Sequence, residues 1–256
     1  MSKNQITFLS KTLAVLLLVV SCGEKQKSTT NDEDPEAISA SAILVFTKTA
    51  GYRHASIEKG VAVLTELGGA HQFTVTQTEN AGDFSLGNLQ RFDLVIFLST
   101  TLDVLDTEQE RAFKSYINQG GSFMGIHAAA DTEYDWPWYG KLVGAYFKSH
   151  PEQQEAVIRV LDQAHPATRH LGGTWKHFDE WYNYKDMNPD VSVLMQLDES
   201  TYSGGENGDN HPIAWYHKYD GGRAFYTGLG HTEESFDDPL FRAHLVGGIT
   251  YCLGRE

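Results

Sequence analysis

The chain has 256 residues, of which 41% are hydrophobic and 21% are charged, with 24 glycines and 7 prolines. This composition is typical of a globular protein and excludes a collagen, a coiled coil or a chain that is disordered throughout. The formal net charge of −14 argues against nucleic acid or an anionic lipid surface as a partner. Sugars and other small metabolites remain open as ligands.

The N-terminal segment has the order of features found in exported bacterial proteins. Lysines precede an apolar run over residues 13–20, which is too short to span a bilayer but fits a secretory signal. The letters VVSC, ending at Cys22, resemble the lipobox of bacterial lipoproteins. We expect a signal peptide over residues 1–21, a lipidated Cys22 and a flexible tether over residues 22–40. The protein would then lie in the cell envelope, in the periplasm or at the cell surface, touching membrane only through its lipid. The alternative is a plainly secreted protein with a free thiol.

From residue 41 onward, short β-branched runs alternate with helical periodicity. Strands are predicted over residues 42–47, 72–77, 93–99 and 122–127. An apolar stripe over residues 57–67 predicts a helix that ends at Gly68, and an N-cap at Asp106 or Thr107 predicts a second helix. The crossovers are long enough for the strands to pair in parallel.

The second half of the chain is less regular. Strands are predicted over residues 156–161, 191–197, 213–219 and 224–229. Some of them are expected to pair antiparallel at the sheet edge. A closing helix carries Cys252 on its apolar stripe, which indicates a core residue. We predict one α/β domain over residues 41–256, with a doubly wound, mainly parallel sheet of the flavodoxin-like or class I glutamine amidotransferase-like kind.

Three histidines follow predicted strands. His54 comes after the first strand, His127 after the fourth and His231 after a later one. Ligands of open parallel sheets collect at the carboxyl ends of the strands, so these imidazoles are expected at one edge. With His150 and Glu180, they offer ligands that suit a divalent zinc, iron or manganese ion. The predicted metal set is His127, His150, Glu180 and His231, while His54 is as compatible with capping the following helix.

Aromatic and acidic residues between these segments suggest a surface for a sugar ring. Trp136 and Trp138 lie in a cluster of aromatic residues, and Asp179 precedes Glu180 within a second cluster. Planar rings stack against sugars in water, although about half of such clusters are ordinary core packing. The two acids can act as a general acid or base if burial raises one pKa.

Four motifs resemble those of the ThuA-like (trehalose utilisation) family. They are GYRHAS at residues 51–56, GGSFMGIHAA at 120–129, DEWY at 179–182 and GRAFYTGLGH at 222–231. The family is itself similar to class I glutamine amidotransferases, in which a strand-to-helix turn carries a nucleophilic cysteine. The matching turn here has His127 in that place. The nucleophile is therefore missing, and we do not expect glutamine hydrolysis.

The resemblance implies a role in carbohydrate metabolism, on trehalose-like disaccharides and their 3-keto derivatives. The preferred hypothesis is a sugar-processing hydrolase, lyase or isomerase in which His127, Glu180 and His231 are acid/base groups or metal ligands. The same hypothesis assigns substrate binding to Arg53, His54, Trp136, Trp138 and Asp179. The first alternative is a non-catalytic carbohydrate-binding lipoprotein that uses the same cleft. The second is a degenerate fold kept as a docking module, which would expose a large apolar patch.

Overall fold

The computed structural model describes residues 40–256. The predicted signal peptide, the lipidated Cys22 and the tether up to residue 39 lie outside the described residues. Within the described part, no helix combines the length and the apolar character needed to cross a bilayer.

Five parallel strands form the first half of the main sheet. In spatial order they are β2 (Phe73–Thr78), β1 (Ser41–Phe46), β3 (Leu94–Leu98), β4 (Ser122–Ile126) and β11 (Gly222–Thr227). The pairings β1 with β2, β1 with β3, β3 with β4 and β4 with β11 are all parallel. Every residue of β3 and β4 is buried, as expected for strands covered by helices on both faces. The predicted α/β class and its parallel sheet are confirmed.

Four antiparallel strands extend this sheet beyond β11. They follow in the order β10 (His211–Tyr219), β9 (Ser192–Leu197), β6 (Gln154–Val160) and β7 (Thr174–Asp179). A separate small sheet pairs β5 (Tyr146–Ser149) with β8 (Asn183–Lys185). The antiparallel part is larger than the sequence predicts, because the segment that forms β7 carries no clear strand signal. Its alternating exposed and buried residues are typical of a sheet edge.

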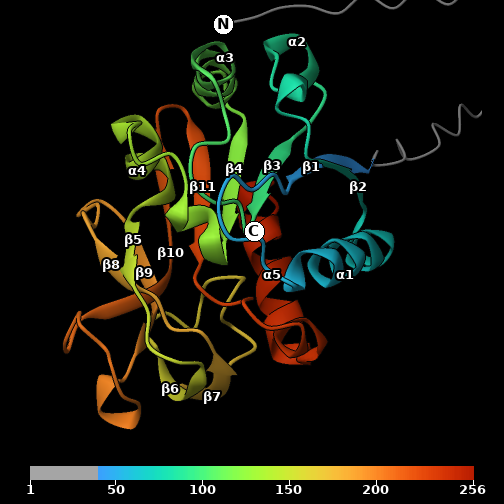
Figure 1. Cartoon of the computed structure of the whole chain (residues 1–256). Helices are drawn as coiled ribbons and strands as arrows, with labels where there is room; N and C mark the ends of the chain where they lie inside the picture. The colour runs from blue at the N-terminus through green and yellow to red at the C-terminus, as the bar shows by residue number, and fades with distance from the viewer. Residues whose placement is uncertain (1–39) are drawn as a thin grey trace, which may run out of the picture. The chain divides into compact units, whose positions relative to one another are not determined.

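Helices cover both faces of the parallel strands (Figure 1). One face carries α1 (Ser56–His71) and α5 (Pro239–Cys252), and the other carries α2 (Leu86–Leu89), α3 (Thr107–Asn118) and α4 (Pro137–Val143). Single 3₁₀ turns are η1 (Ala81–Asp83), η2 (His127–Asp131), η3 (Glu199–Thr201) and η4 (Glu234–Asp237). The predicted N-cap of α3 is Asp106, which forms a capping box with Gln109.

The predicted end of α1 at Gly68 is wrong. The helix continues to His71, and Gln72 adopts the left-handed conformation that ends it. A Cβ atom at Gly68 would lie 2.5 Å from the carbonyl oxygen of Phe73. Gly68 therefore lets the helix approach β2 closely and does not stop it. Cys252 is buried at the end of α5, as predicted.

Candidate metal and substrate site

Three imidazoles and one carboxylate meet at the carboxyl edge of the main sheet. His54, His127, Glu180 and His231 each offer one ligand atom, and these atoms all lie within 4.8 Å of one another. His54 follows β1, His127 follows β4, His231 follows β11 and Glu180 follows β7. The structure thus brings together the imidazoles of His127 and His231, which we expected at one edge from the order of the strands, and the carboxylate of Glu180, which we expected beside them from its chemistry as a ligand.

His127 occupies a sharp turn directly after the buried strand β4. Its φ of 50° lies in the left-handed region, where a residue other than glycine is uncommon. This is the backbone geometry of a nucleophile elbow, which presents one side chain above a sheet. The Nδ1–H group of His127 donates to the carbonyl of Gly228 at 3.0 Å. Nε2 is then left with a free lone pair, 3.1 Å from Nδ1 of His231.

His54 is 4% exposed and packs edge-on against the rings of His127 and His231. Its Nδ1 atom is buried without a hydrogen-bond partner among residues 40–256. Burial, reinforced by the neighbouring imidazoles, lowers the pKa of His54 to about 2, so the ring is neutral. A neutral imidazole with an unpaired buried nitrogen is suited to binding a metal ion.

Glu180 connects the histidines around it. Its Oε2 atom lies 3.1 Å from Nδ1 of His231 and 3.4 Å from Nε2 of His127, and its Oε1 lies 3.1 Å from Nδ1 of His150. Burial opposes the charge, but the adjacent imidazoles of His127 and His231 outweigh it and hold the pKa of Glu180 far below its ordinary value. The compact group differs from the predicted metal set at one position, because it contains His54 in place of His150.

Asp179, which we predicted as a substrate-binding residue, does not line the cavity. It is fully buried and accepts hydrogen bonds from the backbone N–H groups of Glu180, Gly230 and His231 and from the hydroxyl of Ser235. Despite the opposing effect of burial, hydrogen bonding from a neighbouring histidine keeps its pKa low. Asp179 therefore fixes the backbone of two cluster residues, Glu180 and His231, that come from different strands.

A cavity of about 440 Å³ opens above the cluster. We call it the carboxyl-edge cavity; it is lined by Tyr52, His54, Asp131, Phe147, His150, Gln153, Glu180, Tyr182 and His231. The ring of Tyr52 is 67% exposed, whereas Tyr182 is buried. The cavity thus combines polar groups at its base with aromatic walls, which is the composition of a small-molecule site.

Arg53, Trp136 and Trp138 do not line this cavity. The guanidinium group of Arg53 forms ion pairs with Glu58 and Glu79. Trp136 stacks on Trp138, whose indole N–H donates to Asp220 in the turn before β11, at the opposite edge of the sheet. The predicted tryptophan platform is therefore not a wall of the carboxyl-edge cavity.

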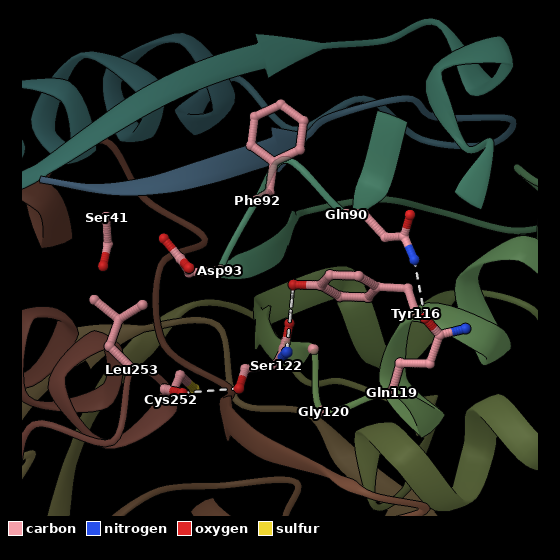
Figure 2. Close-up of a pocket in the computed structure, with 11 residues that line it drawn as sticks. Ser41, Gln90, Phe92, Asp93, Tyr116, Gln119, Gly120, Ser122, Cys252 and Leu253 are labelled. Carbon is pink, nitrogen blue, oxygen red and sulfur yellow. Dashed lines mark hydrogen bonds between the residues drawn. The ribbon is translucent and has the colours of Figure 1, made fainter. Parts of the chain in front are cut away.

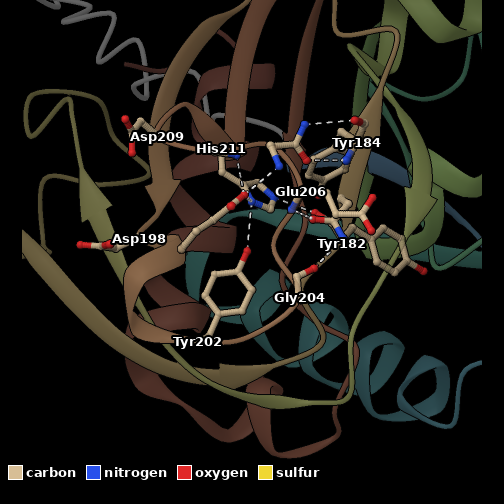
Figure 3. A network of polar contacts seen from close by, with 12 residues as sticks. Tyr182, Tyr184, Asp198, Tyr202, Gly204, Glu206, Asp209 and His211 are labelled. Carbon is tan, nitrogen blue, oxygen red and sulfur yellow. Dashed lines mark hydrogen bonds and ion pairs between the residues drawn. The ribbon is translucent and has the colours of Figure 1, made fainter.

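A polar network contacts the backbone of the segment that carries Tyr182 (Figure 3). The ring of His211 lies between Oε1 of Glu199 at 2.7 Å and the carbonyl of Tyr182 at 2.8 Å. The same carboxylate oxygen accepts the backbone N–H of Asn207. Tyr202 completes the ring of contacts with its hydroxyl 3.0 Å from His211. These bonds fix the polar loop before β10 against the segment that carries Tyr182.

Several cavity residues were not singled out from the sequence. Tyr52 belongs to the same GYRHAS motif as His54, and Asp131 follows His127 by one 3₁₀ turn. Both positions carried a usable signal, because they lie in loops that directly follow buried parallel strands. Phe147 lies in β5 and Gln153 directly precedes β6, and no sequence pattern predicted that the small sheet lies beside the cluster.

Comparison with solved structures shows the fold of this chain in other proteins. A protein described as ThuA-like from Bacteroides uniformis is 23% identical, with a TM-score of 0.72 over 86% of this chain and 94% of that one. A second, from Parabacteroides merdae, is 20% identical, with a TM-score of 0.71 over 84% and 90%. A third protein, from Thermoplasma acidophilum and described as part of a GMP synthase, is 14% identical, with a TM-score of 0.51 over 83% and 96%.

These likenesses agree with a class I glutamine amidotransferase-like fold. No curated protein matches the chain. The family described as ThuA, trehalose utilisation, matches residues 42–252, which is most of the sequence. The chain therefore belongs to the ThuA family.

Proposed function

We propose that this protein is a metal-dependent enzyme that processes a disaccharide, a glycoside or a 3-keto sugar in the carboxyl-edge cavity. The observation that carries the proposal is the group formed by His54, His127, Glu180 and His231, whose ligand atoms lie within 4.8 Å of one another. The group is at the base of a cavity large enough for a sugar ring.

The donor atoms fit a divalent zinc, iron or manganese ion. Imidazole nitrogen and carboxylate oxygen are the ligands these metals share. The hydrogen bond from His127 to the Gly228 carbonyl fixes the tautomer that frees Nε2, as in other histidine ligands. A bound ion would polarise a substrate oxygen or activate a water molecule.

The walls of the cavity favour a carbohydrate over a charged metabolite. Tyr52 offers an exposed aromatic face at the cavity, and Phe147 and Tyr182 add two further rings. Aromatic faces with a few polar groups between them suit the alternating apolar and hydroxylated surfaces of a sugar. Membership of a family described as trehalose utilisation supports the same substrate class.

Glutamine hydrolysis is not part of the proposal. The elbow position that would need a thiol carries the imidazole of His127. Cys252 is buried at the end of α5, and its burial raises the pKa of the thiol far above the ordinary value. Neither position supplies a thiolate for a thioester mechanism.

The test combines metal analysis with product analysis. The protein is loaded with zinc, iron or manganese, its metal content is measured, and it is incubated with trehalose, other disaccharides and their 3-keto derivatives. We expect about one metal ion per chain and turnover that is lost in His127→Ala and Glu180→Gln, but kept in Gln119→Ala at the opposite edge. Sugar binding without turnover by the metal-loaded protein would establish the non-catalytic carbohydrate-binding alternative instead.

We also propose that the protein is exported and anchored in the cell envelope through Cys22. The support is the lipobox-like sequence VVSC after an apolar run. Mass spectrometry of the mature N-terminus and fractionation of cells that express Cys22→Ser test this proposal. Lipid on Cys22, and release of the variant from the membrane fraction, are the expected results.

A further inference from the structure

A second carboxylate faces the carboxyl-edge cavity. Asp131 ends the 3₁₀ turn η2 that His127 begins, and both Asp131 and Glu180 line the cavity. The residues between the two ends of this turn, Ala128 to Ala130, are completely buried. The backbone carbonyl of Asp131 accepts the N–H of Leu102 at 2.7 Å. The turn is thus fixed on both sides, and it holds the Asp131 carboxyl group at the cavity.

The contacts of the two carboxylates differ. Both oxygens of Glu180 contact imidazoles of the cluster, as described above. Asp131 has no ion-pair partner among residues 40–256; its Oδ1 accepts the hydroxyl hydrogen of Tyr134, and no protein hydrogen bond to Oδ2 exists in the same range. Glu180 is therefore placed to remain a carboxylate ligand, whereas one oxygen of Asp131 is free for a substrate.

Burial around Asp131 favours its protonated form more strongly than the nearby positive charges oppose it, so its pKa lies above that of an ordinary aspartate. Burial raises its pKa, and the hydrogen bond from Tyr134 only partly reverses the effect. The other titratable groups that act on it are His127 at the start of the turn, His150 after β5 and Lys185 at the end of β8, and each of them lowers the pKa without cancelling the effect of burial. Two carboxyl groups of one cavity with pKa values displaced in opposite directions are the usual pattern of an acid and a permanently ionised partner.

We propose that Asp131 is the proton-transfer residue of this cavity and that its substrate is an O-glycoside with an alcohol leaving group. The inference rests on the proposed function. The Oδ2–H group donates its proton to the glycosidic oxygen while the C–O bond breaks and its electron pair passes to that oxygen. A water molecule adds to the sugar carbon, and its surplus proton returns to Oδ2, so that one water is consumed and the acid is restored.

The experiment compares two glycosides in the metal-loaded full-length protein: a disaccharide, and the same sugar linked to nitrophenol, which leaves without protonation. We expect Asp131→Asn to lower kcat for the disaccharide by about 10²–10⁴-fold and to affect the nitrophenyl glycoside much less. Metal content and sugar affinity should stay unchanged. Asp103→Asn, which removes an exposed carboxylate outside the cavity, is the matched control and should keep full activity.

The pH profile supplies a readout that a structural role would not change. Activity that needs protonated Asp131 falls as pH rises through its pKa, and this alkaline limb should vanish in Asp131→Asn. Tyr134→Phe removes the hydrogen bond that favours the charged form, so the limb should move to higher pH. Equal losses on both glycosides, or unchanged rates in Asp131→Asn, would overturn the role of Asp131 alone. Wild-type protein that holds metal but cleaves neither glycoside would overturn the proposed function itself.

Discussion

Two cavities of similar size lie at opposite edges of the parallel strands, and they differ in how their polar groups are satisfied. The second one, which we call the amino-edge cavity, has a volume of about 540 Å³. It is lined by Ser41, Gln90, Phe92, Asp93, Tyr116, Gln119, Gly120, Gly121, Ser122, Cys252 and Leu253 (Figure 2).

In the amino-edge cavity the polar groups bond to one another or to backbone. Ser122 donates to the Cys252 carbonyl at 2.8 Å, and Gln90 donates to Gln119 at 2.9 Å. Asp93 accepts the backbone N–H of Ala42. At the carboxyl edge, by contrast, His54 keeps a buried nitrogen without a partner among residues 40–256, and imidazoles crowd around a single carboxylate. Unsatisfied ligand atoms that converge on one point therefore identify a site better than cavity volume does.

The strongest test of this contrast removes groups from each cavity in turn. Replacing His127 by Ala or Glu180 by Gln takes away a cluster ligand, and we expect a fall in turnover of about 10³-fold or more together with loss of bound metal. Gln119→Ala at the amino edge should change neither quantity. Metal analysis and initial rates on the same preparations decide the comparison, and an equal loss in Gln119→Ala would reverse it.

A smaller effect is expected from Asp179, which acts on the site only through the backbone. Asp179→Asn replaces an acceptor of several N–H groups and should weaken metal binding by about 10–100-fold, as is typical of residues that orient ligands. Titration with a competing chelator measures the change, and circular dichroism verifies the fold. Asp186→Asn, on an exposed turn, is the control. Unaltered metal affinity in Asp179→Asn would show that the loop with His231 keeps its place without this carboxylate.

The aromatic wall should contribute less again. Removing the exposed ring in Tyr52→Ala should weaken sugar binding by about 1 kcal/mol, which corresponds to roughly fivefold, because stacking on one ring is lost. Trp138→Ala, on the far side of the sheet, should bind sugar normally. Calorimetry on the metal-loaded proteins gives both affinities. A larger loss of sugar affinity in Trp138→Ala than in Tyr52→Ala would show that sugar binds at Trp136 and Trp138 instead.

The smallest expected effect is a pH dependence of folding stability, caused by the buried imidazoles of His54 and His244. Burial lowers the pKa of His54 to about 2 and that of His244 to about 3, from 6.5 in the unfolded chain. The unfolded chain binds protons that the folded chain does not bind. The free energy of unfolding of metal-free protein should therefore fall as pH drops below 6.5, by about 1.4 kcal/mol per histidine between pH 7.5 and 5.5. Urea unfolding at pH 7.5 and 5.5 measures this loss. His244→Gln should reduce the slope, while the exposed His71→Gln should preserve it.

Much of the parallel half could be predicted from the sequence, because its strands are continuous apolar runs separated by helical stripes. The edge at which His127 and His231 lie followed from the same pattern, since parallel strands end together. The antiparallel half could not be predicted in this way. Strand β7 alternates exposed and buried residues over a short span that contains Lys176 and His177, and its pairing depends on partners distant in the chain.

The details of the site depended on that half. The path of the antiparallel strands back to the carboxyl edge decides whether His54 or His150 completes the cluster. This path cannot be predicted from local sequence. Trp136 and Trp138 follow a cluster residue closely along the chain, yet α4 directs them to the other end of the sheet. Closeness in sequence did not predict closeness in space at these positions, because one short helix carries the chain from one edge of the sheet to the other.

The position of Glu180 after the outermost strand has a consequence for assembly. β7 ends one side of the strand order, whereas His54 follows β1 near the other side. An ion held by both would cross-link regions near the two ends of the strand order, so the complete site exists only once both halves of the sheet have formed. Metal uptake would thus report complete folding, and a chelator would weaken the joint between the halves before it disturbed either one.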